Sequence, residues 1–231
     1  MLEIKGLSAE IEGVQVLRRA NLSLAEGATV ALIGRNGAGK TSLLRAIMGF
    51  MKVTEGAISF DGRPLDGVKA HLRPRFGIGY APEDRRLFSS FSIEENIRLP
   101  AEVMKLPAAE IARRLEGIYA VLPELAELRH RPAAGLSGGQ GKMAALARAL
   151  MVGSRVILLD EPFQGLAPVL ANRYAAALRT LRDSHPDIAL LITESNPSLL
   201  RSFAEKTYAI ERGAVSEASL AASSLAAAGL H

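Results

Sequence analysis

Hydrophobic and polar residues alternate along the first part of the chain with the period of extended strands. The alternation predicts three short strands, at Leu2–Leu7, Val14–Leu17 and Asn21–Leu24. A continuous apolar run of strand length follows at Thr29–Ile33, as expected for a strand that is buried on both faces. In the next segment, Thr41–Phe50, the apolar residues recur at helical spacing. The first fifty residues therefore predict an antiparallel β region, then a buried strand and a helix.

The middle of the chain changes from strands to helices. Strands are predicted at Ala57–Phe60 and Gly77–Tyr80, and helical character extends from about Asp84 to Leu150. Capping boxes, in which a Ser is followed three residues later by Glu or Gln, mark two helix starts. The first is Ser92 with Glu95. The second is Ser137 with Gln140, and it begins a helix that extends to about Met151. Pro107 begins a third helix, which extends through Leu115.

An alternation of strands and helices returns after residue 151. Strands are predicted at Val156–Leu159, Ile188–Thr193 and Thr207–Ile210, with helices at Val169–Leu181 and Ser198–Phe203. No internal repeat is visible. The layout predicts one domain over 1–231, with an α/β core at 1–84 and 152–231 and an inserted helical subdomain at 85–151.

A glycine-rich loop lies between the predicted strand Thr29–Ile33 and the helix after it. It matches the phosphate-binding pattern GxxxxGK[ST] in full. Its glycines allow successive N–H groups to surround a polyphosphate, Lys40 adds a positive charge, and the Thr41 hydroxyl is suited to Mg²⁺. The predicted ATP contacts are Gly34, Arg35, Asn36, Gly37, Ala38, Gly39, Lys40, Thr41 and Ser42.

Two adjacent acids end the predicted strand Val156–Leu159. Because side chains alternate across a strand, Asp160 and Glu161 point in different directions and can do different work. We expect Asp160 to bind Mg²⁺, directly or through water, and Glu161 to polarise the attacking water. Two exposed turn acids are the alternative interpretation, which the upstream loop disfavours.

A second glycine-rich segment, Leu136-Ser137-Gly138-Gly139-Gln140, provides a hydroxyl and bare amides at a helix N-terminus. One ATP does not easily occupy two such loops of a single chain, so we expect this segment to cover the nucleotide of a facing protomer. The segment resembles the signature of ATP-binding cassette (ABC) ATPases, and the motifs occur in that family's order over nearly the whole chain. The resemblance implies a P-loop NTPase core of the α/β class, with an N-terminal antiparallel β subdomain and an inserted α-helical subdomain. It also implies a dimer that closes on two ATP and drives membrane-embedded permeases.

Two further segments resemble the subgroup that takes up branched-chain amino acids or urea. One is Tyr80–Phe88 followed by Ser92–Asn96, and the other is Asp160-Glu161-Pro162 followed by Gly165-Leu166-Ala167-Pro168. Most cassettes carry Gln where this chain has Glu83, and Glu is typical of the subgroup. The resemblance implies that Glu83 contacts Mg²⁺ and the water, a role that suits a hard carboxylate oxygen.

The chain departs from the family pattern at three places. Ile11 stands near the position of an aromatic that stacks on adenine, so we expect apolar contact without stacking. Phe163 and Gln164 follow Pro162 where Ser is usual first. Ser195 stands where the family has a γ-phosphate-sensing His, or Gln in the subgroup, and its shorter, uncharged side chain predicts slower hydrolysis or a bridging water. The alternative is that Ser195 merely ends a strand.

The amino-acid composition narrows the kinds of ligand and partner that we expect for this chain. Hydrophobic residues make up 48% of the 231 residues and charged residues 23%, as in an ordinary globular domain. The chain has no cysteine, and its four histidines lack the spacing of a metal site. Arginines occur in short groups without interleaved aromatics, which favours protein partners over nucleic acid. No stretch approaches the ~18 apolar residues of a membrane span and no secretion signal is visible, so we expect a peripheral protein on the cytoplasmic face of the cell membrane.

These features predict an ATP-hydrolysing importer subunit for branched-chain amino acids or a similar small polar solute. We expect a homodimer or a heterodimer with a related cassette, bound to permease subunits and served indirectly by an extracytoplasmic solute-binding protein. A nucleotide-gated dimerising subunit with weak hydrolysis is the main alternative. A cassette acting on nucleic acid would carry two cassettes or a coiled-coil insertion, and a small-molecule kinase has no use for residues 136–140.

Overall fold

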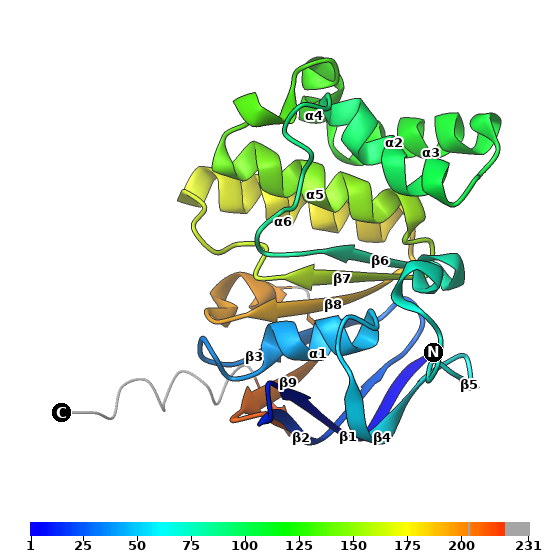
Figure 1. Cartoon of the computed structure of the whole chain (residues 1–231). Coiled ribbons are helices and arrows are strands. Elements are labelled where there is room, and N and C mark those ends of the chain that lie inside the picture. Colours follow the sequence, from blue (N-terminus) through cyan, green and yellow to red (C-terminus); the bar gives the residue numbers. More distant parts are fainter. Residues whose placement is uncertain (203, 220–231) are drawn as a thin grey trace. The chain divides into compact units, whose positions relative to one another are not determined.

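The computed structural model in Figure 1 describes residues 1–202 and 204–219. The chain forms two compact units: Met1–Arg73 with the segment from Ala189 onward, and Pro74–Ile188. The phosphate loop thus belongs to the first unit, and the acid pair and the second glycine loop belong to the second. The predicted subdomain bounds, 84/85 and 151/152, separate segments by secondary structure rather than by compactness and remain a prediction.

The first unit contains an antiparallel sheet in the order β2-β1-β4-β5. The prediction of two strands within residues 14–24 is wrong, because β2 is one strand. Arg19 has a φ of 45° and the register shifts between the pairs Leu7–Ala20 and Ala9–Leu17. The polar residues between Leu17 and Asn21, which suggested a break between two strands, therefore lie in a β-bulge of one continuous strand. The strands are β1 (Leu2–Ile11), β2 (Val14–Leu24), β4 (Val53–Phe60) and β5 (Arg63–Pro64).

The first unit also contains the strand that leads into the phosphate loop. β3 (Thr29–Ile33) is buried along its whole length, as its apolar run predicted, and it pairs in parallel with β8 and β9. β10, antiparallel to β9, was not predicted, since most of its residues have low β propensity. The predicted helix Ser198–Phe203 is instead a 3-10 helix, and Phe203 lies outside the described residues. The elements are α1 (Lys40–Ile47), β8 (Ala189–Glu194), η3 (Pro197–Ser202), β9 (Lys206–Glu211) and β10 (Ala214–Ala218).

The second unit combines two parallel strands with helices. α5 packs directly on β6 (Figure 1), and the contact is close because Gly79 has no side chain: a Cβ there would lie 2.2 Å from the Ala149 carbonyl oxygen. Both predicted capping boxes are confirmed, at the starts of α2 and α5. The elements are β6 (Ile78–Ala81), α2 (Ile93–Val103), α3 (Ala108–Val121), α4 (Pro123–Leu128), η2 (Ala133–Gly135), α5 (Gly138–Val152), β7 (Val156–Asp160) and α6 (Pro168–Ser184), and η1 (Ala70–Phe76) precedes β6.

The predicted α/β class, with an antiparallel β region, P-loop strands and a helical segment, is confirmed. Within the described part of the chain, no helix has the length and apolar character needed to cross a membrane. The Ala-rich tail from Ala218 to Leu230, for which the sequence suggested an additional helix, lies almost entirely outside the described residues.

Candidate functional site

The phosphate loop follows β3 and is anchored to its neighbours by backbone contacts. The Gly34 N–H donates to the Glu194 carbonyl at 3.2 Å, and the Gly213 N–H donates to the Ala38 carbonyl at 2.9 Å. Gly39 has a φ of 114°, and a Cβ there would lie 2.9 Å from the Val16 carbonyl oxygen. A Cβ at Gly34 would lie 2.5 Å from the Ile210 carbonyl oxygen. The loop's course therefore requires glycine at both positions.

Lys40 is buried at the first position of α1, and its ammonium group turns back onto the loop. It donates to the carbonyls of Gly34 and Arg35, the latter at 3.0 Å. It also donates to Ser195 Oγ at 3.2 Å, and Ser195 Oγ in turn donates to Asn36 Oδ1 at 2.7 Å. The structure therefore brings Ser195, which the sequence assigned to the phosphate sensor, into direct contact with the lysine of the loop.

The remaining predicted nucleotide contacts of the first unit are more accessible. Thr41 and Ser42 are partly exposed in the first turn of α1, and Arg35, Asn36 and Gly37 are exposed in the loop itself. Ile11 ends β1 opposite Val14, and these two apolar side chains are 42% and 65% exposed. Exposed apolar side chains at a hairpin end suit contact with a flat apolar ligand surface, such as a nucleobase.

Arg73 is a supporting residue that sequence reasoning missed. Its buried guanidinium donates to the carbonyls of Ala46, at 2.9 Å, and Ile47 at the C-terminal end of α1. It also donates to the Leu65 carbonyl at 3.1 Å and the Val68 carbonyl at 3.2 Å. Burial lowers the pKa of Arg73, and Asp66 opposes this shift. A cation thus satisfies the negative end of the helix that carries Lys40. All four acceptors are backbone atoms, so no sequence motif marks this role.

The acid pair of the second unit is buried at the end of β7. Asp160 is 2% exposed and accepts a hydrogen bond from the Tyr80 hydroxyl at 3.2 Å. Glu161 is 3% exposed and has a φ of 47°, a left-handed conformation that is uncommon for a residue other than glycine. Its carbonyl accepts from the Lys142 ammonium and from the Gln164 N–H. Lys142, on α5, is a second residue that the sequence did not single out.

The segment after β6 carries Glu83, which is exposed, and then turns sharply. Arg85 and Arg86 have φ values of 61° and 47°. The Arg148 guanidinium on α5 donates to both of their carbonyls, at 2.6 Å and 2.5 Å. Burial lowers the pKa of Arg148, with Asp84 opposing the shift, and the group remains a cation at neutral pH. Arg148 thus fixes the segment next to Glu83 to the helix that begins at the second glycine loop.

The second glycine loop begins α5 with reciprocal capping bonds. Ser137 Oγ accepts from the Gln140 N–H at 3.2 Å, and Gln140 Oε1 accepts from the Ser137 N–H at 3.0 Å. Gly139 is buried, and a Cβ there would lie 2.7 Å from Leu170 Cδ1. Leu136 is half-buried, whereas Gly138 is exposed, and a Cβ there would meet only Arg85 Nη1, at 4.0 Å. The loop therefore presents backbone amides to the surface at the positive end of a helix.

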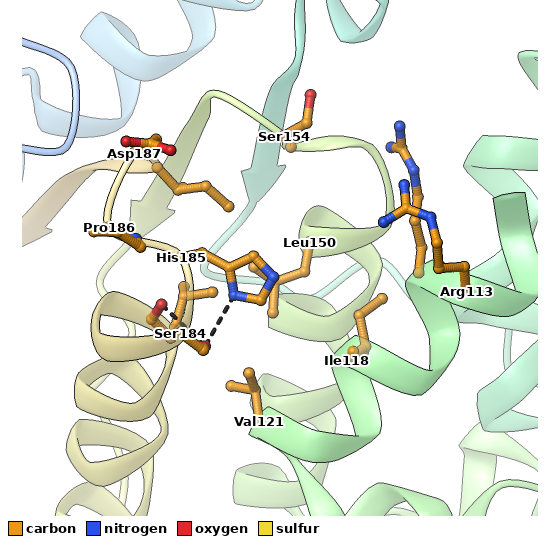
Figure 2. A pocket seen from close by; sticks show the side chains of 14 residues that line it. Arg113, Ile118, Val121, Leu150, Ser154, Ser184, His185, Pro186 and Asp187 are labelled. Atoms are coloured by element: carbon orange, nitrogen blue, oxygen red, sulfur yellow. Dashed lines mark hydrogen bonds between the residues drawn. The ribbon is translucent and has the colours of Figure 1, made fainter.

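A pocket of about 350 Å³ opens elsewhere in the second unit, where the ends of α3, α5 and α6 meet (Figure 2). Ile118, Val121 and Leu150 supply its apolar wall, and Ser184 Oγ lies 2.9 Å from the His185 ring. Arg113 at its rim is already bonded to Glu110 at 2.7 Å. None of the predicted site residues lines this pocket.

Comparison with known proteins identifies a family that matches this chain and several similar proteins. Residues 17–164 match the profile of the ABC transporter family. The branched-chain amino acid transport ATP-binding protein BraG of Pseudomonas aeruginosa is 30% identical, covering 93% of this chain and 91% of BraG. The lipopolysaccharide export ATP-binding protein LptB of Acidithiobacillus ferridurans is 32% identical, covering 93% and 88%. The structure of cbiO1 from Clostridium perfringens, part of the transporter complex cbiONQ, is 27% identical with a TM-score of 0.79, covering 93% and 86%.

The profile match covers more than half of the chain, and it includes the phosphate loop, the second glycine loop and the acid pair. The relatives cover nearly all of the chain, although their names assign them different solutes. The chain therefore belongs to the ABC transporter family, as an ATP-binding subunit with ATPase activity.

Proposed function

We propose that this subunit powers the uptake of a small polar solute, with branched-chain amino acids as the leading class. It would do so by closing with a second cassette, a copy of itself or a related chain, on two ATP. The similarity to BraG and the Glu83-containing segment support the solute class. The exposed Gly138 at the start of α5 carries the proposal of closure, since among the described residues a Cβ there would meet only Arg85 Nη1, at an ordinary contact distance of 4.0 Å, and no packing by these residues requires glycine.

The first unit would bind the polyphosphate. Lys40 would exchange its bonds to the loop carbonyls and to Ser195 for phosphate oxygens, and the loop N–H groups would surround the β-phosphate. Ile11 would contact the adenine through its exposed apolar surface. Ser195, already bonded to Lys40 and Asn36, would sense the γ-phosphate.

The donor set fits a magnesium ion. Mg²⁺ in ATPases is usually held by one or two carboxylates or hydroxyls together with substrate phosphates and water, so a cluster of several acids is not required. Among the described residues no group of three or more His, Cys, Asp or Glu forms such a cluster. Thr41, Asp160 and Glu83 would hold the ion, which would supply neutralisation of the phosphate charge.

Glu161 would act on the water. Its buried carboxylate would accept the proton of a water whose oxygen attacks the γ-phosphorus, while the bond from that phosphorus to the β–γ bridging oxygen breaks and ADP leaves. The bonds from Lys142 and Gln164 hold the Glu161 backbone in its left-handed conformation. Positioning of this kind would contribute to the rate of hydrolysis, because a misplaced base loses its alignment with the reacting atoms.

The permease would dock on an exposed aromatic pair near Glu83. Phe88 and Phe91 are 51% and 38% exposed, and their rings stack at 5.3 Å. Buried Asn96 fixes both, because its amide accepts from the Phe88 N–H and donates to the carbonyls of Phe88 and Phe91. Rigid, exposed aromatics are typical anchors of protein interfaces. An extracytoplasmic solute-binding protein would act through that permease.

Replacement of Glu161 by Gln tests the proposal. We expect turnover to fall by about a hundredfold or more, the effect of losing a general base, while MgATP binding persists and an ATP-dependent dimer accumulates. Phosphate release and analytical ultracentrifugation measure the two effects. Wild-type turnover in this variant would remove Glu161 from the mechanism. Negligible phosphate release by the unmodified chain, with ATP-driven dimerisation retained, would support the nucleotide-gated alternative instead.

A further inference from the structure

The side chain of Arg85 crosses the first turn of α5, next to the second glycine loop. An ideal Cβ at Gly141 would lie 2.9 Å from Arg85 Cδ and 3.0 Å from its Nη1. An ideal Cβ at Gly138 would lie 4.0 Å from the same Nη1. The absence of a side chain at Gly141 therefore leaves room for the Arg85 side chain. The guanidinium of Arg85 comes close to Gly138, the exposed glycine of the loop.

The backbone that directs Arg85 there is held from within the same unit. Arg148 bonds the carbonyls of both Arg85 and Arg86, which have left-handed φ values. A left-handed conformation at two successive arginines persists only where surrounding contacts enforce it. The backbone position from which the Arg85 side chain extends toward α5 is therefore fixed within this unit.

The charge of Arg85 is not neutralised by the described residues. Its side chain is half-buried, yet it makes no hydrogen bond and no ion pair within the described part of the chain. The adjacent Arg86 differs, because its Nε donates to Asp84 Oδ2 at 2.7 Å. A half-buried guanidinium with five unused donors favours an anionic acceptor from outside the chain.

We propose that Arg85 contacts the γ-phosphate of the ATP that is bound to the facing protomer. The guanidinium extends the anion-binding surface of Ser137 and Gly138 with a charged donor, a contribution that backbone amides alone do not make. This inference rests on the proposed closure of two cassettes around ATP. It adds a residue from the Glu83 segment to that shared site, so the segment contributes a cation as well as the carboxylate.

The test uses the full chain with Glu161→Gln, so that closure is not followed by turnover. MgATP-driven association is measured by analytical ultracentrifugation, with the second protomer supplied as the same chain or as a related cassette. Arg85→Ala is expected to weaken association by about tenfold or more, the usual effect of a charge-assisted hydrogen bond. The difference should shrink at high salt, and Arg85→Lys should recover part of the loss.

Arg86→Ala is the matched control. It removes the same side-chain type from a neighbouring left-handed position, but from a guanidinium that Asp84 already pairs. It should leave association unchanged. A fluorescent ATP analogue bound to the isolated protomer should show equal affinity in the parent, Arg85→Ala and Arg86→Ala chains, because Arg85 acts only across the interface.

A second variant, on α5, disturbs the same contact. Gly141→Ala would place its methyl against Arg85 Cδ and displace the guanidinium, while alanine is the better helix former. We expect weaker association with thermal stability that is equal or higher. Equal association of Arg85→Ala and Arg86→Ala, or weaker ATP binding by the isolated Arg85→Ala protomer, would overturn this inference alone. Absence of MgATP-driven association in the parent chain would overturn the proposed closure and this inference with it.

Discussion

The two glycine-rich loops, residues 34–40 and 136–140, both lead into a helix, but different constraints act on their glycines. In the first loop the requirement is internal: Gly39 is left-handed, and Gly34 and Gly39 lie where a Cβ would collide with backbone carbonyls. In the second loop Gly138 has no such neighbour and no positive φ. A glycine that the fold does not need indicates a surface that something else approaches. The comparison thus separates a loop whose glycines are required by contacts within the chain from a loop whose exposed Gly138 is not, which is what the proposed closure on a second protomer requires.

The largest expected effect comes from Gly138→Asp. A side chain fits at Gly138, where a Cβ would meet only Arg85 Nη1 at 4.0 Å, and an acid is favourable in the first turn of α5 and beside that guanidinium, so the thermal stability should be unchanged or slightly higher. Its carboxylate would neutralise Arg85 and repel the phosphate of the facing protomer, and we expect ATP turnover to fall by about a hundredfold. Thermal denaturation and phosphate release measure the two properties. A loss of stability that parallels the loss of turnover would show that Gly138 serves the fold.

An opposite pattern is expected for Gly39→Ala. The left-handed φ of 114° and the 2.9 Å approach of the Val16 carbonyl both penalise a methyl group. Strained backbone of this kind costs about 1–3 kcal/mol, so the free energy of unfolding should fall by that amount and ATP binding should weaken with it. Urea titration checks this. Unchanged stability would contradict the distinction between the loops.

Much of this distinction was accessible from sequence. The pattern GxxxxGK[ST], the strand Thr29–Ile33 and the capping box at Ser137 all follow from local chemistry, and the structure confirms these elements. Arg73, Arg148 and Lys142 were not predicted, because each bonds backbone carbonyls distant in sequence and backbone acceptors leave no mark on residue identity. The length of β2 was missed because a bulge is a property of strand pairing. The roles of the individual site residues remain predictions.

The smallest expected effect on turnover concerns Ser195, one of the three departures from the family pattern. Its hydroxyl bonds Lys40 and Asn36 within the first unit, and a histidine would reach farther and carry a proton. Ser195→His should raise turnover by about fivefold, the value of roughly one additional hydrogen bond in the transition state. Phosphate release at saturating MgATP measures it. An unchanged or lower rate would indicate that Ser195 does not limit hydrolysis.

Complementation between two inactive chains tests the shared site most directly. Lys40→Ala removes the lysine that is proposed to bind phosphate and leaves residues 136–140 intact, whereas Gly138→Asp alters the second glycine loop and leaves Lys40 intact. In an equal mixture half of the dimers contain one of each chain, and each mixed dimer has one complete site of two, so turnover should return to about a quarter of the wild-type value. A mixture that stays as inactive as either variant alone, although the unmodified chain hydrolyses ATP without a second kind of cassette, would contradict the account.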